Sequence, residues 1–185
     1  MTGLRAAVVA VIVLGLVAAT AAATYASRGH HSEGGKRIAI RDDCDGSDPA
    51  WNAVGGCTRK HGRVTVAEFN GELASPLSAA VIGHQAWRND PSYLVIKQGQ
   101  TIKVKNKGGR GHTLTEVAQW GGGVVPPLSG GLATAPECAN LLELAPGESA
   151  KLAGLTVGNH RFICCFHPWM RALVKVEPSN KKHQH

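Results

Sequence analysis

The sequence predicts an all-β fold in a single domain; two observations support the fold class and the length supports the single domain. The chain holds 23 Gly and 9 Pro among 185 residues, and both residue types are typical of turns. Runs enriched in aromatic and β-branched residues, which favour strands, lie between these turns. Without its N-terminal leader the chain has about 150 residues, the size of one domain with an ordinary core.

Residues 1–26 are expected to be a signal peptide or an N-terminal anchor. Arg5 precedes an apolar run over residues 6–23, and the run ends in small residues that suit cleavage before Thr24. The run is also nearly long enough for an uncleaved anchor, since about 20 apolar residues span a bilayer. Either way, we expect the rest of the chain to be exported to the periplasm or the extracellular face, soluble or N-terminally anchored.

The remaining chain divides into four predicted segments: a linker over 27–36, an N-terminal extension packed on the domain over 37–89, the main domain over 90–177, and a flexible tail over 178–185. The linker and the tail carry histidines that could bind metal weakly, although solvated chain ends explain them as well. The formal charge of +7 is scattered, without a dense basic segment. We therefore expect no nucleic-acid partner.

The extension begins with a polar loop. Cys44 and Cys57 bracket this loop, and Trp51 within it is expected to fold back onto the body. Residues 64–69 begin with three consecutive β-branched residues and predict a strand, followed by a turn at residues 70–71.

A short helix is expected after that turn. Ser75 suits the cap position, Pro76 the first helical position and Gly83 the stop. His84 follows in a loop. We interpret His84 as structural, because no matching donors lie near it in the sequence.

The main domain consists of strand-like runs. The first two predicted strands, 93–96 and 101–106, are expected to form an edge of the sandwich. The loop over 120–140 is too long for a tight connection, which predicts a functional or covering role. The other predicted strands are residues 112–117, 149–155, 160–164 and 172–177.

The turn at residues 164–170 concentrates the chemistry of the chain. Side chains alternate along a strand, so Cys164 shares a face with Phe162, while Cys165 points the other way. Phe162 is the better core residue, so Cys164 is expected to face inward. Soft thiolate and thioether donors select copper, and imidazole suits both of its oxidation states. The donors then have the spacing C-x2-H-x2-M, formed by Cys164, His167 and Met170.

This turn resembles the copper loop of the plastocyanin and amicyanin branch of the cupredoxins, whose amicyanin version reads Cys-Thr-Pro-His-Pro-Phe-Met. In that family a further histidine comes from the end of an earlier strand, and His112 fits that place. The resemblance covers residues 90–177. It implies a cupredoxin-like Greek-key β-sandwich with a short helix and long loops, and one type 1 copper ion per chain. The implied ligands are His112, Cys164, His167 and Met170.

Two positions depart from the family pattern. Thr113 follows the first histidine where the family commonly has Asn, and Cys165-Phe166 replaces a polar or Pro-containing pair. Neighbours of the ligands tune a metal's potential, so these changes bear on the reduction potential and not on the ligand set. Taken singly, a Cys or a Met on an apolar strand is more often a core residue. Four donors in family order favour the metal.

The cysteine count is consistent with an exported copper protein. Five cysteines less one ligand leave four, and disulfides persist in exported chains. Four cysteines allow three connectivities. We favour Cys44 with Cys57, the nearest pair in sequence, and Cys138 with Cys165, which gives the outward-facing thiol a partner from the long loop.

The resemblance implies a monomeric blue copper protein that carries single electrons between redox partner proteins. It is not expected to be an enzyme, because four side-chain donors leave no open metal position. The alternative is an extracytoplasmic copper storage or delivery protein. A third class, a copper or thiol oxidoreductase, is disfavoured because adjacent cysteines lack the C-x-x-C spacing.

Apolar residues around His167 predict a docking surface for those partners. They include Phe166, Pro168 and Trp169, together with residues 124–128 of the long loop. The alternative is that Trp169 and the long loop cap the core.

Overall fold

The computed structural model describes residues 36–60, 62–74 and 87–179. They all belong to the second of two compact units, residues 1–31 and 32–185. Across these described ranges, no helix combines the length and apolar character needed to cross a membrane. The predicted leader, most of the linker, the helix at 75–83, His84 and the histidines of the linker and tail lie outside the described residues.

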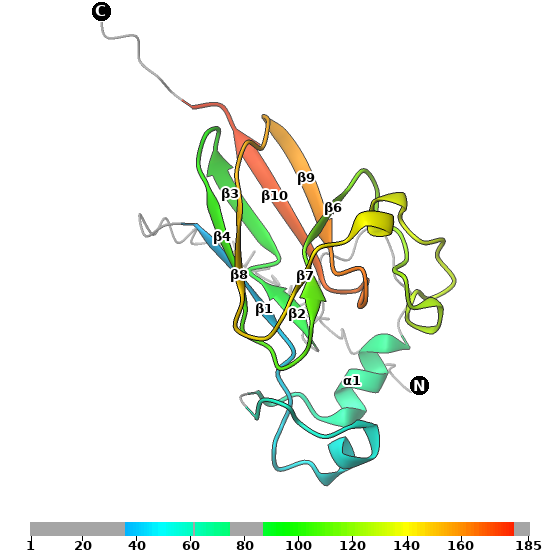
Figure 1. The fold of residues 1–185 in the computed structure, drawn as a ribbon. Coiled ribbons are helices and arrows are strands. Elements are labelled where there is room, and N and C mark those ends of the chain that lie inside the picture. Colours follow the sequence, from blue (N-terminus) through cyan, green and yellow to red (C-terminus); the bar gives the residue numbers. More distant parts are fainter. Residues whose placement is uncertain (1–35, 61, 75–86, 180–185) are drawn as a thin grey trace, which may run out of the picture. The chain divides into compact units, whose positions relative to one another are not determined.

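The described chain is built mainly of short strands, with one α-helix and three 3-10 helices (Figure 1). The strands are β1 (Arg37–Arg41), β2 (Arg88–Asp90), β3 (Tyr93–Lys97), β4 (Ile102–Asn106), β5 (His112–Thr113), β6 (Thr115–Val117), β7 (Glu143–Leu144), β8 (Ser149–Leu152), β9 (Gly158–Ile163) and β10 (Arg171–Glu177). The helices are η1 (Pro49–Val54), α1 (Val66–Leu73), η2 (Pro126–Leu128) and η3 (Pro136–Asn140).

The strands form two four-stranded sheets and one short ribbon. The first sheet has the order β2-β1-β4-β8 and the second β3-β10-β9-β6, while β5 pairs with β7. The pairs β1–β4 and β10–β3 are parallel, and the other pairs are antiparallel. Buried residues of both sheets, such as Ile40 and Val104 of the first and Phe162 and Val174 of the second, share one core. The predicted all-β sandwich is confirmed.

Side chains on the two faces of β9 pack in two different hydrophobic clusters. Phe162 and Cys164 belong to the main core between the sheets. Ile163 and Cys165 lie in a second cluster with Cys138 of the long loop. This alternation confirms that Cys164 faces inward, and it shows that the long loop covers the outer face of the second sheet.

Both expected disulfides are present. Cys44 is bonded to Cys57, and Cys138 is bonded to Cys165. Cys164 is a free, buried thiol. Trp51 is buried in the main core, so it does fold back from the loop between Cys44 and Cys57.

The strand predicted over residues 64–69 is wrong. Helix α1 begins at Val66, and Thr65 caps it through a capping box with Glu68. In this motif the Thr65 side chain accepts a hydrogen bond from the Glu68 amide, while the Glu68 carboxylate accepts one from the Thr65 amide. The hydrogen-bonded end groups of the helix outweigh the weak strand preference of the β-branched residues at 64–66. The predicted turn at 70–71 consequently lies inside the helix.

Three further expectations need correction. Strands β3 and β4 do not pair: β3 is an edge strand of the second sheet, and β4 lies inside the first. The strand predicted at 112–117 is interrupted at Leu114, and its halves pair with different partners, β7 and β9. Strand β1 belongs to the first sheet between β2 and β4. Residues 37–41 are therefore part of the sandwich rather than packed on it.

His160 links β9 to its neighbours and predicts a pH-dependent stability. Its two ring nitrogens face Glu116 Oε1 at 2.6 Å and the Thr156 carbonyl at 2.8 Å. Burial lowers the pKa of His160, but these two acceptors outweigh burial and raise it above 6.5. The protonated ring therefore stabilises the fold fully below pH 6.5, and this stability is lost as the pH rises through the raised pKa.

We expect His160→Gln to lower the free energy of unfolding below about pH 6, by no more than about 1 kcal/mol because the pair is partly exposed. Above the raised pKa the wild type and the variant should converge. Urea unfolding at both pH values measures this, and an equal loss at both would contradict a charged His160.

Candidate metal centre

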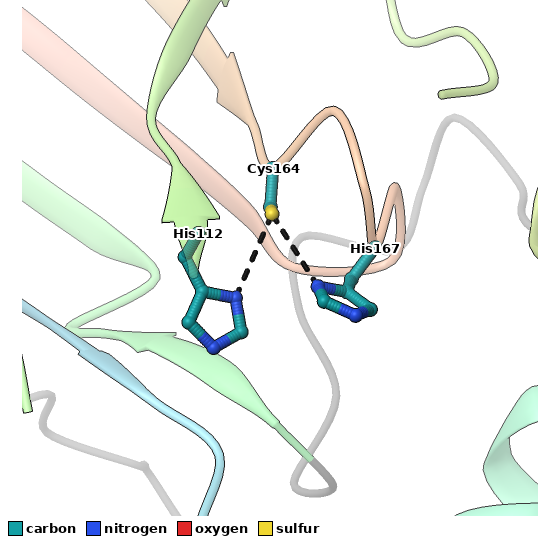
Figure 2. A group of neighbouring side chains, drawn as sticks. All are labelled: His112, Cys164 and His167. Atoms are coloured by element: carbon teal, nitrogen blue, oxygen red, sulfur yellow. Dashed lines mark hydrogen bonds between the residues drawn. The ribbon is translucent and has the colours of Figure 1, made fainter. Parts of the chain in front are cut away.

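Three potential ligands converge at one end of the sandwich (Figure 2). His112 opens β5, Cys164 follows β9, and His167 lies in the turn before β10. Cys164 Sγ is 3.7 Å from His112 Nδ1 and 3.5 Å from His167 Nδ1. All three ligand atoms lie within 4.8 Å of one another. The structure therefore brings together three of the four residues expected to bind metal.

The two sulfur–nitrogen separations fit a single metal ion. Bonds from a first-row ion such as zinc to thiolate sulfur and imidazole nitrogen are about 2.3 and 2.0 Å long. Between tetrahedral and trigonal angles, such bonds place sulfur and nitrogen about 3.5 to 3.7 Å apart, as observed here. One thiolate and two imidazoles are also the donor chemistry of type 1 copper.

Met170 lies at the end of the same turn. Its side chain is fully buried in the main core. Its amide donates to the His167 carbonyl at 2.8 Å, and its carbonyl accepts the Cys164 amide at 3.0 Å. These bonds fix the position of its backbone relative to Cys164 and His167, and its role as an axial ligand is a proposal.

The turn is held from several sides. The Thr113 amide donates to Cys164 Sγ at 3.4 Å, and the Thr113 hydroxyl accepts the Cys165 amide at 2.8 Å. The amide side chain of Asn89 donates to the Met170 carbonyl, and the Val124 amide donates to the Cys165 carbonyl. The departures noted in the sequence thus have structural roles: Thr113 binds both cysteines of the turn, and Cys165 is tied by its disulfide to the long loop.

The ligands polarise one another in the absence of metal. Burial raises the pKa of the Cys164 thiol, but hydrogen bonds from His112 and His167 outweigh burial and lower this pKa to about 5. Burial likewise disfavours a charged His112, yet its hydrogen bonds with Asp42 and Cys164 raise the pKa of His112 to about 9. The cluster therefore supplies a thiolate at neutral pH, the form that binds metal.

A buried carboxylate supports His112 from the side opposite Cys164. Asp42 Oδ2 is 3.2 Å from His112 Nε2. Burial raises the pKa of Asp42, but hydrogen bonds from His112 and from the amides of Gly109 and Arg110 hold it below its ordinary value. Asp42 is therefore an anion at neutral pH.

Aromatic rings surround His167. Trp87 makes a T-shaped contact with the His167 ring at 5.3 Å, and the Trp169 ring lies at the same distance. The guanidinium of Arg110 lies 4.8 Å above the Trp87 ring. Trp87 is only 6 % exposed, and His167 itself is half-buried.

The predicted docking role of Trp169 is contradicted. Trp169 is 1 % exposed and contacts Phe69 of α1, so it cannot present a surface to a partner. The alternative interpretation holds for this residue, because Trp169 packs in the main core together with Phe69 and Leu128. Helix α1, absent from the sequence prediction, explains the burial.

The sequence analysis missed two residues of the site, Asp42 and Trp87. The sequence does carry a signal for Asp42, because it follows Ile38 and Ile40 at every second position and so shares their strand face. The structure shows that all three are buried. Nothing comparable marks Trp87, whose backbone has a left-handed φ of 53° and whose neighbours at the site are distant in sequence.

Comparisons with known proteins give a fold likeness only. No protein-family model matches the chain, and no curated protein matches it. A purple cupredoxin from Nitrosopumilus maritimus is 22 % identical, with a TM-score of 0.39, over 51 % of this chain and 86 % of that one. A copper(I) form of an amicyanin variant is 23 % identical, with a TM-score of 0.35, over 56 % of this chain and 92 % of that one. These TM-scores are low, so the architecture is argued from the two sheets of this chain, and the metal site from the donor chemistry of His112, Cys164 and His167.

Proposed function

We propose that this protein binds one copper ion through His112, Cys164, His167 and Met170 and carries single electrons between redox partner proteins. When bound, copper supplies the copper(II)/copper(I) couple. The observation that carries the proposal is the cluster of one buried thiol and two imidazoles, whose two sulfur–nitrogen separations are already at metal-ligand spacing in the protein alone.

The residues around the cluster suit a carrier because they limit movement. An electron carrier needs ligands that stay in place in both oxidation states. Here backbone hydrogen bonds close the turn at both ends, Thr113 joins it to β5, and the Cys138–Cys165 disulfide joins it to the long loop. The side chain of Asn89 adds a bond from β2.

His167 is the proposed route for electrons. Of the four proposed ligands it alone is partly exposed, whereas His112, Cys164 and Met170 are fully buried. The aromatic rings of Trp87 and Trp169 hold the His167 ring in place. A partner would therefore exchange electrons at the edge of His167, without the direct contact to Trp169 expected from sequence.

A storage or delivery protein is the second candidate, and one experiment separates the two. The copper-loaded protein is reduced with ascorbate and reoxidised with ferricyanide, over repeated cycles, in the presence of bicinchoninate, a copper(I) chelator. A carrier should lose its visible colour and regain it in every cycle without losing copper. Transfer of the copper to the chelator within minutes of reduction would instead support delivery.

We also propose that the protein works outside the cytoplasm. The two disulfides support this location, because disulfides persist in oxidising compartments and are rare in the cytosol. The N-terminal apolar run supports it independently. Detection of the protein in the periplasmic or extracellular fraction, and not in the cytosol, tests this.

Met170→Gln is predicted to keep a coloured site at a lower reduction potential. A thioether favours copper(I), so a harder amide oxygen as the weak axial ligand favours copper(II). The potential is measured by spectroelectrochemistry, with Met170→Leu as the control that removes the donor and keeps the volume. Equal potentials for the wild type and both variants would show that Met170 does not contact the metal.

A further inference from the structure

We infer that Asp42 is the positioning residue that orients His112 for metal binding, so that strand β1 and the segment after it are a working part of the site. The inference takes the identity of the metal from the proposed function, but the orientation of His112 is tested on the metal-free protein. It is built on the contacts of the Asp42 carboxylate.

The Asp42 carboxylate is enclosed by the loop of residues 108–110. Asp42 is 2 % exposed and follows β1 directly. Its Oδ1 accepts the amide of Gly109 at 2.7 Å, and its Oδ2 accepts the amide of Arg110 at 2.8 Å. A Cβ at Gly108 would lie 2.5 Å from Oδ1, so this loop can wrap the carboxylate only because residue 108 is glycine. The glycine-rich stretch before His112 is thus shaped to receive Asp42.

The same carboxylate sets which ring nitrogen faces the metal site. Oδ2 is 3.2 Å from His112 Nε2, while Nδ1 faces Cys164 Sγ. A nitrogen bonded to a carboxylate must carry the proton, since the carboxylate only accepts. Nε2 therefore keeps its hydrogen, and Nδ1 is the nitrogen available to a metal. A ligand histidine held in this way has a fixed ring orientation and greater basicity.

The second histidine, His167, has different neighbours in the described part of the chain. Among the residues that the structure describes, no carboxylate bonds to the His167 ring. Its neighbours are Cys164, the ring of His112 and the aromatic rings of Trp87, Trp169 and Phe166. The two histidines therefore differ in kind: a buried anion holds His112, and aromatic packing holds His167. A negative charge bonded to only one ligand should favour the more positive copper(II) over copper(I).

The attachment of Asp42 extends the functional unit toward the N-terminus. Cys44, two residues further on, is buried and bonded to Cys57, and β1 pairs with both β2 and β4. A metal-binding fragment that began at residue 90, the predicted start of the main domain, would lack Asp42. The amides of Gly109 and Arg110 would then lose the carboxylate that accepts their hydrogen bonds.

The first test uses the full-length, metal-free protein labelled with 15N at histidine. In the wild type we expect a slowly exchanging proton on His112 Nε2, seen by NMR. Asp42→Ala should lose this signal or exchange it at least tenfold faster, whereas Asp43→Ala should keep it. Asp43 is the matched control, because it is the adjacent carboxylate and pairs with Arg41 and Arg88 instead of His112. An unprotonated Nε2 in the wild type would overturn the inference.

The second test measures copper binding with Asp42→Asn, which keeps the shape of the side chain and removes its charge. We expect its copper(II) affinity to fall about 10- to 100-fold and its copper(I) affinity to fall less. Each tenfold fall in the ratio of the copper(II) affinity to the copper(I) affinity raises the reduction potential by about 59 mV. Asp43→Asn should change neither affinity by more than about twofold, since its ion pairs are partly exposed.

Equal affinities and potentials for Asp42→Asn and Asp43→Asn would overturn the inference, since a merely structural Asp42 would not shift the potential. A wild type that binds no copper would refute the proposed function. The first test would still decide the role of Asp42 in that case.

Discussion

Cys164→Ser is expected to abolish the visible colour of the oxidised copper protein. The colour of a type 1 site depends on its thiolate, and Cys164 is the free thiol among the described cysteines. We expect the copper(II) affinity to fall more than about 100-fold. Removing a residue that only supports a ligand costs about 10- to 100-fold, and removing a ligand itself should cost more. Absorption spectra and competition with a chelator measure both effects. The fold should survive, because the amide of Thr113 can bond to the serine hydroxyl.

The matched control is the double variant Cys138→Ser, Cys165→Ser, which leaves no unpaired partner cysteine. It removes a disulfide between residues 27 positions apart, and its free energy of unfolding should fall by about 3 to 4 kcal/mol. Its colour should remain, because Cys165 points to the second cluster and away from the ligands. Colour lost in the double variant and kept in Cys164→Ser would move the metal ligand to Cys165.

Trp169→Ala is expected to destabilise the protein strongly. The indole is almost completely buried and packs against Phe69 beside His167. Removing a buried tryptophan side chain costs about 3 to 5 kcal/mol, a large part of the stability of an ordinary domain. Urea unfolding of the copper-free protein measures the loss.

Tyr93→Ala is the control, because the Tyr93 side chain is 50 % exposed on the edge strand β3. Its loss should stay within about 1 kcal/mol. If Trp169→Ala were as mild as Tyr93→Ala and slowed electron exchange with a partner, Trp169 would be a docking residue and the core position would be wrong.

Most strands of the second sheet, and the turn between β9 and β10, could be predicted from the sequence. Alternation along β9 decides which cysteine faces inward, because the period of two residues is strict in a strand. The same alternation gives Cys165 to the long loop and so predicts the second disulfide. These predictions use only the order of neighbouring residues along one strand, so they do not depend on knowing which distant segments pack against it.

The parts that sequence missed depend on contacts between distant segments. Asp42 lies 70 residues before His112, and the parallel pairing of β1 with β4 brings their two segments together. The β-branched residues at 64–66 favour a strand, whereas the capping box of Thr65 and Glu68 favours the helix α1 that forms. Because Phe69 lies on α1 and packs against Trp169, a strand over residues 64–69 gives no reason to expect Trp169 to be buried.

The central claim is that His112, Cys164, His167 and Met170 hold one type 1 copper ion. The absorption spectrum of the copper-loaded, ferricyanide-oxidised protein tests it most directly. We predict an intense blue band that grows in proportion to added copper and stops at one ion per chain. A colourless protein at full copper occupancy, or a band that needs more than one ion per chain, would contradict the claim.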